Sequence, residues 1–268
     1  MTTNATKTAV ITGASSGLGQ SFARRLAAEG YNLLITARRK EQLEAFRDEL
    51  IEKHGVRVEV YVADLSDDQQ VKHLADHIQT IDDLEMLVNN AGFGTAGNIV
   101  DVDIESQVHM IQVHVVAPLR LMHAALQGMK QRRRGEIINV ASMASFLYGA
   151  GSASYCATKA CILNYSRSIA AEVRPLGIRV QALCPGFIYT GFHDTKEMEN
   201  FERSQIPKPL WMNADFVVNY SLKCLRRGKV VCIPKWFYRV GLAIFLTPGV
   251  STVLRFLFEG RMNRTDKK

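Results

Sequence analysis

The sequence predicts an α/β protein with a doubly wound architecture, in which helices cover both faces of a parallel β-sheet. Short β-branched runs alternate along the 268 residues with segments of helical periodicity, and a glycine-rich turn follows the first run. No linker, composition break, internal repeat or low-complexity segment divides the chain. Strands that alternate with helices pair in parallel through right-handed crossovers, so we expect ligands at the carboxyl ends of the strands.

The same alternation places each expected element in order. The first strands are expected at 8–12, 32–36 and 57–62, followed by helices at 17–29, at 39–53 and from a capping box of Ser66 and Gln69 to residue 79. Later strands are expected at 86–89, 136–141, 179–183 and 230–233, with helices at 104–132, at 154–173 and between Asn213 and Gly228. We expect one domain over residues 1–268, with a substrate loop at 187–212 and a C-terminal extension at 234–268.

Composition and charge exclude several other classes of protein. Apolar residues make up 47% and charged residues 22% of the chain, which is typical of a globular protein rather than of disorder or a coiled coil. Basic residues that contribute to the net charge of +7 cluster at 38–40, 132–134, 226–227 and 261–268. A nucleic-acid or anionic membrane surface is one interpretation. We favour solvated helix ends and loops, since no nucleic-acid-reading motif accompanies the clusters, and we expect no nucleic-acid partner.

Cysteine and histidine usage favours neither a disulfide framework nor a metal site. The five cysteines are an odd number without a C-x-x-C pair, which favours reduced core thiols in a cytoplasmic protein. His73 and His77 lie four residues apart without a third ligand nearby, so we interpret them as a solvated helix face rather than as metal ligands.

The sequence also predicts a cytoplasmic protein without a membrane span. The first seven residues lack the apolar run of a signal peptide. The longest uncharged stretch near the C-terminus, at 240–254, is interrupted by Pro248 and Gly249 and is too short to cross a bilayer.

A glycine-rich turn follows the first expected strand, and its residues read Thr12-Gly13-Ala14-Ser15-Ser16-Gly17-Leu18-Gly19. Glycines let the backbone approach a pyrophosphate closely, and the helix that follows offers free N–H groups and a positive dipole end. The spacing G-x3-G-x-G differs from the commoner G-x-G-x-x-G, and an ordinary tight turn is the alternative. Its position directly after the first strand favours a dinucleotide phosphate site.

Arg38 and Arg39 follow the second expected strand, where a dinucleotide fold faces the adenosine ribose. An acidic residue there binds the ribose 2′-hydroxyl, whereas arginine accommodates a 2′-phosphate. A basic helix start is the alternative, but cations are disfavoured at that end of a helix. The sequence therefore predicts NADP(H) rather than NAD.

Three side chains form a candidate catalytic set. Tyr155 and Lys159 lie four residues apart on an expected helix and share one face, and Ser142 ends the fifth strand. An ammonium group near a phenol favours the phenolate, so we expect Lys159 to lower the pKa of Tyr155 toward the working pH. Tyr155 would then protonate a carbonyl oxygen as hydride reaches the carbon, while Ser142 orients that oxygen. Taken alone, such a tyrosine and lysine pair is usually structural.

Together these motifs resemble the short-chain dehydrogenase/reductase family in its compact form. The matching pieces are Thr12 to Gly19, Asp64, Asn89-Asn90-Ala91-Gly92, Ser142, Tyr155-x-x-x-Lys159 and Pro185-Gly186-x-x-x-Thr190, in family order over about residues 7–192. The resemblance implies a Rossmann fold with a seven-stranded parallel sheet. It also implies assembly as homodimers or homotetramers through the helices after the fourth and fifth strands.

The resemblance also assigns cofactor contacts along the chain. The glycine turn, with Gly13, Ser15, Ser16, Gly17, Leu18 and Gly19, would hold the phosphates. Asp64 and Leu65 would contact the adenine, and Asn90, Ala91 and Gly92 would line the adenosine side. Pro185, Gly186, Ile188 and Thr190 would hold the nicotinamide, and Lys159 would also bind its ribose.

His114 is a departure from the family, which usually has asparagine at this position. In the family, the backbone carbonyl of that asparagine holds a water that links the lysine to solvent. Pro118 has no N–H to bond to the carbonyl of residue 114, so that carbonyl stays available for a water and we predict that the relay survives. The alternative is that His114 only packs within its helix.

The segments expected near the substrate contain large apolar residues. Phe192, Phe201, Pro207 and Pro209 lie in the substrate loop, which we expect to be mobile and to include a helix, and Trp236-Phe237-Tyr238 and Ile244-Phe245-Leu246 lie beyond it. An apolar or lipid-like substrate under a lid, even at a membrane surface, is one interpretation, whereas core or subunit packing is the favoured one. The C-terminal part also loosely resembles a bacterial-type branch of broadly annotated reductases in this family.

The sequence thus predicts a cytoplasmic, NADPH-dependent reductase of ketones or aldehydes, or the reverse dehydrogenase. One alternative is a non-catalytic NADP(H)-binding redox sensor or scaffold, against which the intact Ser142, Tyr155 and Lys159 argue. Another is an isomerase of the extended relatives, which have a larger second domain that this chain lacks.

Overall fold

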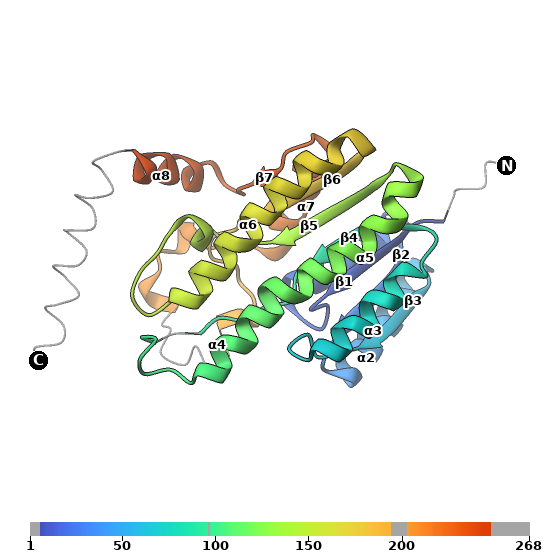
Figure 1. Cartoon of the computed structure of the whole chain (residues 1–268), viewed down its shortest axis with the longest axis horizontal. Helices are drawn as coiled ribbons and strands as arrows, with labels where there is room; N and C mark the ends of the chain where they lie inside the picture. The colour runs from blue at the N-terminus through green and yellow to red at the C-terminus, as the bar shows by residue number, and fades with distance from the viewer. Residues whose placement is uncertain (1–5, 96, 194–202, 248–268) are drawn as a thin grey trace, which may run out of the picture. The chain divides into compact units, whose positions relative to one another are not determined.

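The computed structural model describes residues 6–95, 97–193 and 203–247, and it contains the predicted parallel sheet of seven strands (Figure 1). The strands are β1 (Thr8–Thr12), β2 (Asn32–Ala37), β3 (Val58–Val62), β4 (Leu84–Asn89), β5 (Gly135–Val140), β6 (Ile178–Leu183) and β7 (Val231–Cys232). Their order in the sheet is β3-β2-β1-β4-β5-β6-β7. The order reverses between β1 and β4, which is where doubly wound sheets bind their ligands.

Helices cover both faces of this sheet, as predicted. They are α1 (Gly17–Ala28), α2 (Lys40–His54), α3 (Asp68–Gln79), α4 (Ile104–Ile111), α5 (Ala117–Arg132), α6 (Ala153–Val173) and α7 (Ala214–Arg226). A further helix, α8 (Trp236–Leu246), belongs to a separate C-terminal unit. α3 packs against α5 and α4 against α6 on one face, whereas α1 packs against α2 and α7 on the other (Figure 1). With both faces covered, the central strand β1 is buried along its whole length, which explains the apolar run of Ala9, Val10 and Ile11 at its centre.

The expected helix at 104–132 is interrupted by one wide turn. A π-helical turn, Gln112–Val116, joins α4 to α5, and the N–H of Ala117 donates to the carbonyl of Gln112. Pro118 explains the change, because its ring excludes the ordinary hydrogen bond to the carbonyl of His114. Such π-turns are frequent at functional sites, and this one contains His114.

The expected capping box at Ser66 and Gln69 is wrong. The N-cap of α3 is Asp67, whose carboxylate accepts hydrogen bonds from the backbone N–H groups of Gln69 and Gln70. Ser66 instead donates its hydroxyl to Asp64, with 2.8 Å between the two oxygens. The helix begins at Asp68 because a carboxylate is a stronger acceptor for orphan N–H groups than a hydroxyl.

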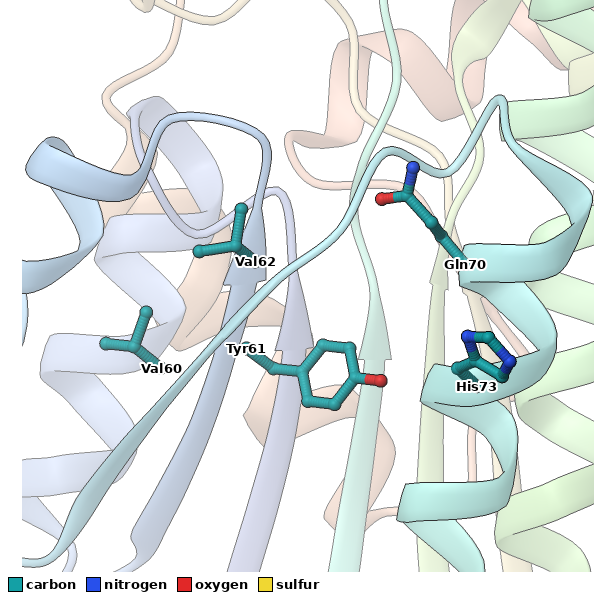
Figure 2. Close-up of a pocket in the computed structure, with 5 residues that line it drawn as sticks. All are labelled: Val60, Tyr61, Val62, Gln70 and His73. Atoms are coloured by element: carbon teal, nitrogen blue, oxygen red, sulfur yellow. The ribbon is translucent and has the colours of Figure 1, made fainter.

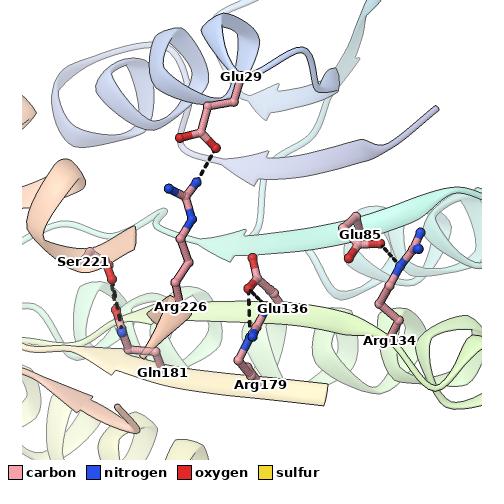
Figure 3. A network of polar contacts seen from close by, with 8 residues as sticks. All are labelled: Glu29, Glu85, Arg134, Glu136, Arg179, Gln181, Ser221 and Arg226. Atoms are coloured by element: carbon pink, nitrogen blue, oxygen red, sulfur yellow. Dashed lines mark hydrogen bonds and ion pairs between the residues drawn. The ribbon is translucent and has the colours of Figure 1, made fainter. Parts of the chain in front are cut away.

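Ion pairs fasten the amino-terminal ends of neighbouring strands (Figure 3). Glu136 on β5 is 6% exposed and pairs with Arg179 on β6 at 2.6 Å. Glu85 on β4 pairs with Arg134, which directly precedes β5, also at 2.6 Å. Two more pairs in the figure, Glu29 with Arg226 and Gln181 with Ser221, join α7 to α1 and to β6. All four pairs lie away from the carboxyl ends of the strands, so they support the sheet without entering a ligand site there.

The expected substrate loop at 187–212 is described only in part. Gly191–His193, Arg203–Gln205 and Lys208–Leu210 form single turns of 3-10 helix. Residues 194–202, which include Phe201, lie outside the described residues.

Residues 1–232 form one compact unit and residues 233–268 a second. The described part of the second unit contains α8, whose sequence is WFYRVGLAIFL. None of the helices in the described residues is long and apolar enough to cross a membrane.

Candidate active site

The glycine turn packs directly against the loop that follows β4. Gly13 has a φ angle of +66°, and a Cβ atom there would lie 2.8 Å from the Cα of Ala91. The side-chain oxygen of Thr12 accepts the N–H groups of Asn90 and Ala91, with nitrogen–oxygen distances of 2.9 and 3.0 Å. The Asn90 amide in turn donates to the carbonyls of Thr12 and Gly13. These contacts fix the two predicted cofactor segments to each other at the switch point of the sheet.

The N-terminus of α1 is free to receive an anion. Ser16, its N-cap, makes no side-chain capping bond, and the first turn contains no acidic residue. Arg39 places a guanidinium group beside it, since its Nη2 donates to the hydroxyls of Ser15 and Ser16 at 2.8 and 3.2 Å. Free N–H groups, a positive helix end and a guanidinium form a suitable site for a pyrophosphate.

The two arginines after β2 point to different partners. Arg39 contacts the glycine turn, whereas the Arg38 side chain is 73% exposed and its Nη1 lies 3.9 Å from the Asp64 carboxylate. Asp64 also accepts the backbone N–H and hydroxyl of Ser66. Leu65, the other predicted adenine contact, is buried at 6% exposure. Arg38 is therefore an open guanidinium beside the predicted adenosine site, able to pair with a phosphate.

Ser142 follows β5 and opens a short 3-10 helix, Met143–Phe146. Its hydroxyl accepts the N–H of Ala144 at 3.1 Å, and its own N–H donates to the hydroxyl of Ser145. Ser145 donates to the backbone carbonyl of Lys159 at 2.8 Å. The serine at the end of the strand is thus held against the helix that carries the other two predicted catalytic residues.

Lys159 is buried beneath Tyr155. It is 5% exposed, and its Nζ donates to the carbonyl of Val140 at 3.0 Å. Burial lowers the pKa of this amine to about 8. The ammonium lies 5.7 Å from the centre of the Tyr155 ring, as the four-residue spacing predicts.

The expected lowering of the Tyr155 pKa is wrong for the protein without ligand. Burial raises the pKa of Tyr155 to about 12, and a side-chain hydrogen bond with Ser142 opposes this only in part. Loss of water around the phenolate outweighs the attraction of a cation nearly 6 Å from the ring centre. Tyr155 therefore carries its proton at neutral pH and makes contact with Ser142.

His114 is buried between the loop after β4 and helix α6. It is 2% exposed, and its ring makes edge contacts with Tyr155 and Phe93 at centroid distances of 5.9 and 5.6 Å. A Cβ atom on Gly92 would lie 2.9 Å from its Nε2 and 3.5 Å from the Nζ of Lys159. His114 thus lies against Gly92 and Tyr155, and Gly92 also approaches Lys159, so the ring sits among residues predicted for the site.

The segment after β6 closes the remaining side of the site. The N–H of Met143 donates to the carbonyl of Pro185 at 2.9 Å, so this segment lies against the Ser142 turn. Ile188 is buried and bridges to Met212. A Cβ atom on Gly17 would lie 3.1 Å from the Thr190 side chain. The residues predicted for the phosphates and for the nicotinamide therefore meet at Gly17 and Thr190.

Comparison with known proteins identifies the family. Residues 7–200 match the family described as short chain dehydrogenase. The chain belongs to the short-chain dehydrogenase family. This confirms the resemblance inferred from the motifs, and with it an oxidoreductase on the Rossmann-like fold of that family.

Relatives of this short-chain dehydrogenase include a reductase similar in sequence and two dehydrogenases of known structure. The 3-oxoacyl-[acyl-carrier-protein] reductase FabG of Staphylococcus aureus is 34% identical over 75% of this chain and 83% of the relative. A short-chain dehydrogenase from Sphingobium yanoikuyae, in complex with NADPH, has a TM-score of 0.80 at 29% identity, covering 98% of this chain and 96% of that one. The bulky-bulky ketone specific alcohol dehydrogenase from Comamonas testosteroni has a TM-score of 0.75 at 28% identity, covering 98% and 94%.

A cavity of this short-chain dehydrogenase lies between β3 and α3, away from Ser142, Tyr155 and Lys159 (Figure 2). It measures about 300 Å³ and is lined by Val60, Tyr61, Val62, Gln70 and His73, none of which was predicted to bind cofactor or substrate. The ring of His77 on the same helix stacks on Tyr61, and its Nε2 bonds to Glu59 at 2.8 Å. Within the described residues, no group of three or more histidine, cysteine or carboxylate side chains is placed to hold a metal.

Several residues that build the site were not predicted to do so. Thr12 orders the loop after β4, Ser145 joins the Ser142 turn to α6, and Thr158 and Phe93 contact His114. Thr158 could have been suspected, because its spacing of three from Tyr155 places both on one helix face. The other contacts join segments far apart in the sequence, and no local pattern indicates them.

Proposed function

We propose that this short-chain dehydrogenase uses NADPH to reduce a ketone or aldehyde to an alcohol. The observation that carries the proposal is the meeting of Ser142, Tyr155 and Lys159 at the carboxyl end of β5. The two hydroxyls contact each other, and the ammonium lies behind the phenol ring. Such a pair of donors suits an oxygen that gains negative charge during reaction.

The protonation states favour reduction. NADPH, when bound, supplies the hydride that a carbonyl carbon accepts. Tyr155 gives its proton to the carbonyl oxygen, and Ser142 donates a hydrogen bond to the same oxygen. A pKa of about 12 keeps Tyr155 protonated at neutral pH, as an acid catalyst must be. The charged amine of Lys159 stabilises the phenolate that remains. Oxidation would start from that phenolate, which burial disfavours.

The choice of NADPH rests on two guanidinium groups. Arg39 bonds to the hydroxyls of the glycine turn, and the exposed Arg38 stands beside Asp64, where an adenosine ribose would lie in this fold. The relative from Sphingobium yanoikuyae was solved with NADPH, which supports the same choice. Arg38 would pair with the 2′-phosphate and Arg39 with phosphate oxygens nearer the helix.

An apolar substrate is the third part of the proposal. Phe192 lies against Tyr155 with 6.1 Å between ring centres, so an aromatic wall flanks the proton donor. Tyr189 stacks on Trp211 at 4.9 Å in the same segment after β6. The Comamonas testosteroni relative acts on bulky ketones by its name, which supports a substrate with large apolar groups.

A panel of carbonyl compounds tests the proposal. A bulky aromatic ketone, a long-chain aldehyde, an oxosteroid and a small dialdehyde are each mixed with NADPH or NADH, and the nicotinamide absorbance is followed. We expect turnover with NADPH that is highest on the bulky apolar compounds. Tyr155→Phe should lower kcat by about a thousandfold or more. Tyr165→Phe, an exposed tyrosine of the same helix, should leave it unchanged.

Two results would argue against the proposal. Binding of NADPH without turnover on any compound, and without effect of Tyr155→Phe, would favour a redox sensor or scaffold. A preference for NADH would overturn the assignment of Arg38.

A further inference from the structure

Both ring nitrogens of His114 are engaged in hydrogen bonds. Its Nε2 accepts the backbone N–H of Phe93 at 3.0 Å. Its Nδ1 lies 3.1 Å from the hydroxyl oxygen of Thr158. The imidazole therefore joins the loop after β4 to helix α6 from a position that is 2% exposed.

Counting the protons fixes the state of this ring. The backbone N–H of Phe93 can only donate, so Nε2 must be an acceptor without a proton. The single hydroxyl proton of Thr158 is donated to the carbonyl of Tyr155 at 2.9 Å, so Nδ1 must be the donor in the other bond. The hydrogen bonds thus define a neutral imidazole with its proton on Nδ1. A proton on Nε2 would face the N–H of Phe93 and break that bond.

The surroundings favour the same state. Burial and the nearby ammonium of Lys159 lower the pKa of His114 well below its usual value, so the ring stays uncharged at neutral pH. Tyr155, the other titratable group against the ring, is also neutral there, since burial raises its pKa. A ring that can neither give up nor gain a proton without losing a hydrogen bond is unsuited to proton transfer.

We propose that the His114 side chain is a positioning residue that fixes Tyr155 relative to the loop at Gly92 and Phe93. This proposal rests on the proposed role of Tyr155 as proton donor. His114 acts on Tyr155 in two ways: through Thr158, which bonds to the Tyr155 carbonyl, and through the edge contact between the two rings. Because His114 holds the loop that the glycine turn also contacts, it aligns the acid with the cofactor side of the site.

Two substitutions each remove one of the two hydrogen bonds of the His114 ring and keep the other. The amide of asparagine reaches the position of Nδ1 and can donate to Thr158, but it is too short to accept from Phe93. The amide of glutamine reaches the position of Nε2 and can accept from Phe93, but it leaves Thr158. We expect His114→Asn and His114→Gln each to lower kcat about tenfold with little change in the KM for NADPH, and His114→Phe to lower it further. His109→Gln, an exposed histidine on α4, is the control.

A double-mutant cycle tests the path through Thr158. Thr158→Val should lower kcat about as much as His114→Gln, and the double variant should be little worse than either, because each breaks the same bond. Additive losses would show that the two residues act separately and would overturn this path.

The protonation state can be read in the wild-type protein without any assay of activity. In cofactor-free protein with ¹⁵N-labelled histidine, the His114 signals should show a neutral ring protonated at Nδ1, unchanged over the pH range in which an ordinary histidine titrates. An imidazolium or a proton on Nε2 in that range would overturn the proposal. If the tautomer is found as expected but Tyr155→Phe retains activity, the proposed function fails while the geometry of His114 stands.

Discussion

Replacing Lys159 with methionine should stabilise the protein near neutral pH. Lys159 is 5% exposed, and burial lowers the pKa of its amine from the usual 10.5 to about 8. An amine whose pKa is lower in the folded protein binds its proton more tightly in the unfolded chain, so its charge opposes folding below about pH 8. At about 1.4 kcal/mol per pH unit, this penalty is about 3 kcal/mol near pH 7.

The substitution also removes one favourable contact. Methionine retains most of the length and apolar surface of lysine, but it loses the hydrogen bond from Nζ to the carbonyl of Val140. Such a bond contributes about 1 kcal/mol, which leaves an expected gain of about 2 kcal/mol. In a protein of this size, the gain corresponds to a rise in Tm of about 4–8 °C.

The pH dependence identifies the cause of the gain. The penalty on Lys159 disappears as the pH rises from about 8 toward 10.5, so the advantage of the variant should shrink by about 2 kcal/mol between pH 7 and pH 10. Urea unfolding of both proteins at these pH values measures it. The raised pKa of Tyr155 lowers alkaline stability in both proteins and cancels in the difference. Lys130→Met, an exposed position on α5, should change stability by less than about 0.5 kcal/mol. A variant less stable than wild type near pH 7 would refute the reasoning.

Three further predictions concern the cofactor site and the assembly. Arg38→Asp should raise the KM for NADPH about tenfold or more and reduce the preference for NADPH over NADH, because a carboxylate would repel the 2′-phosphate. Steady-state kinetics with both cofactors measure this preference, and an unchanged preference would contradict the prediction. Gly13→Ala should weaken NADPH binding and stability far more than Gly55→Ala. Both glycines have a φ of +66°, but a Cβ would meet Ala91 in one case and open space in the other. At Gly55, where only backbone strain acts, alanine should cost about 1 kcal/mol of stability. Calorimetric titration with NADPH and thermal unfolding compare the two variants. Equal losses in both would show that the clash with Ala91 is not what makes Gly13→Ala harmful. Val108→Glu should dissociate an oligomer, since Ile104, Val108 and Ile111 form an exposed apolar stripe on α4; sedimentation measures this, and a wild-type monomer would contradict it.

The fold could be predicted from local patterns because most of its elements obey them. The strands are short β-branched runs, and Asn213 caps α7 as expected. Two expectations failed where a nearby residue changed the local balance. Asp67 replaced Ser66 as the cap of α3, and Pro118 forced a π-turn into the helix expected at 104–132. The residues responsible are visible in the sequence, but the choice between neighbouring hydrogen-bond partners depends on the folded backbone.

The candidate site was predictable in its members and less so in its electrostatics. In the structure, Ser142, Tyr155 and Lys159 of these motifs meet near the end of one strand, and Gly17 lies against Thr190. The spacing of four between tyrosine and lysine could not reveal that Lys159 is buried and Tyr155 half-buried. Burial raises the pKa of Tyr155 to about 12 and lowers that of Lys159 to about 8, and only the packed structure shows that it outweighs their mutual attraction.

Because Tyr155 is neutral before the reaction, Lys159 contributes to the rate mainly through an interaction that forms when Tyr155 loses its proton. Before proton transfer, the ammonium faces a neutral phenol 5.7 Å from its ring centre, and their attraction is weak. When Tyr155 gives up its proton, the ring becomes negative, and with that charge taken at the ring centre its attraction to the ammonium is about 3 kcal/mol at an effective dielectric constant of about 20. An interaction that is stronger in the transition state than before it lowers the barrier. Lys159→Met should therefore lose about a hundredfold in kcat under saturating NADPH, although it gains stability near pH 7. Rapid-quench measurement of the chemical step gives this ratio, and a variant that is both more stable and equally fast would show that the buried charge has no part in the reaction.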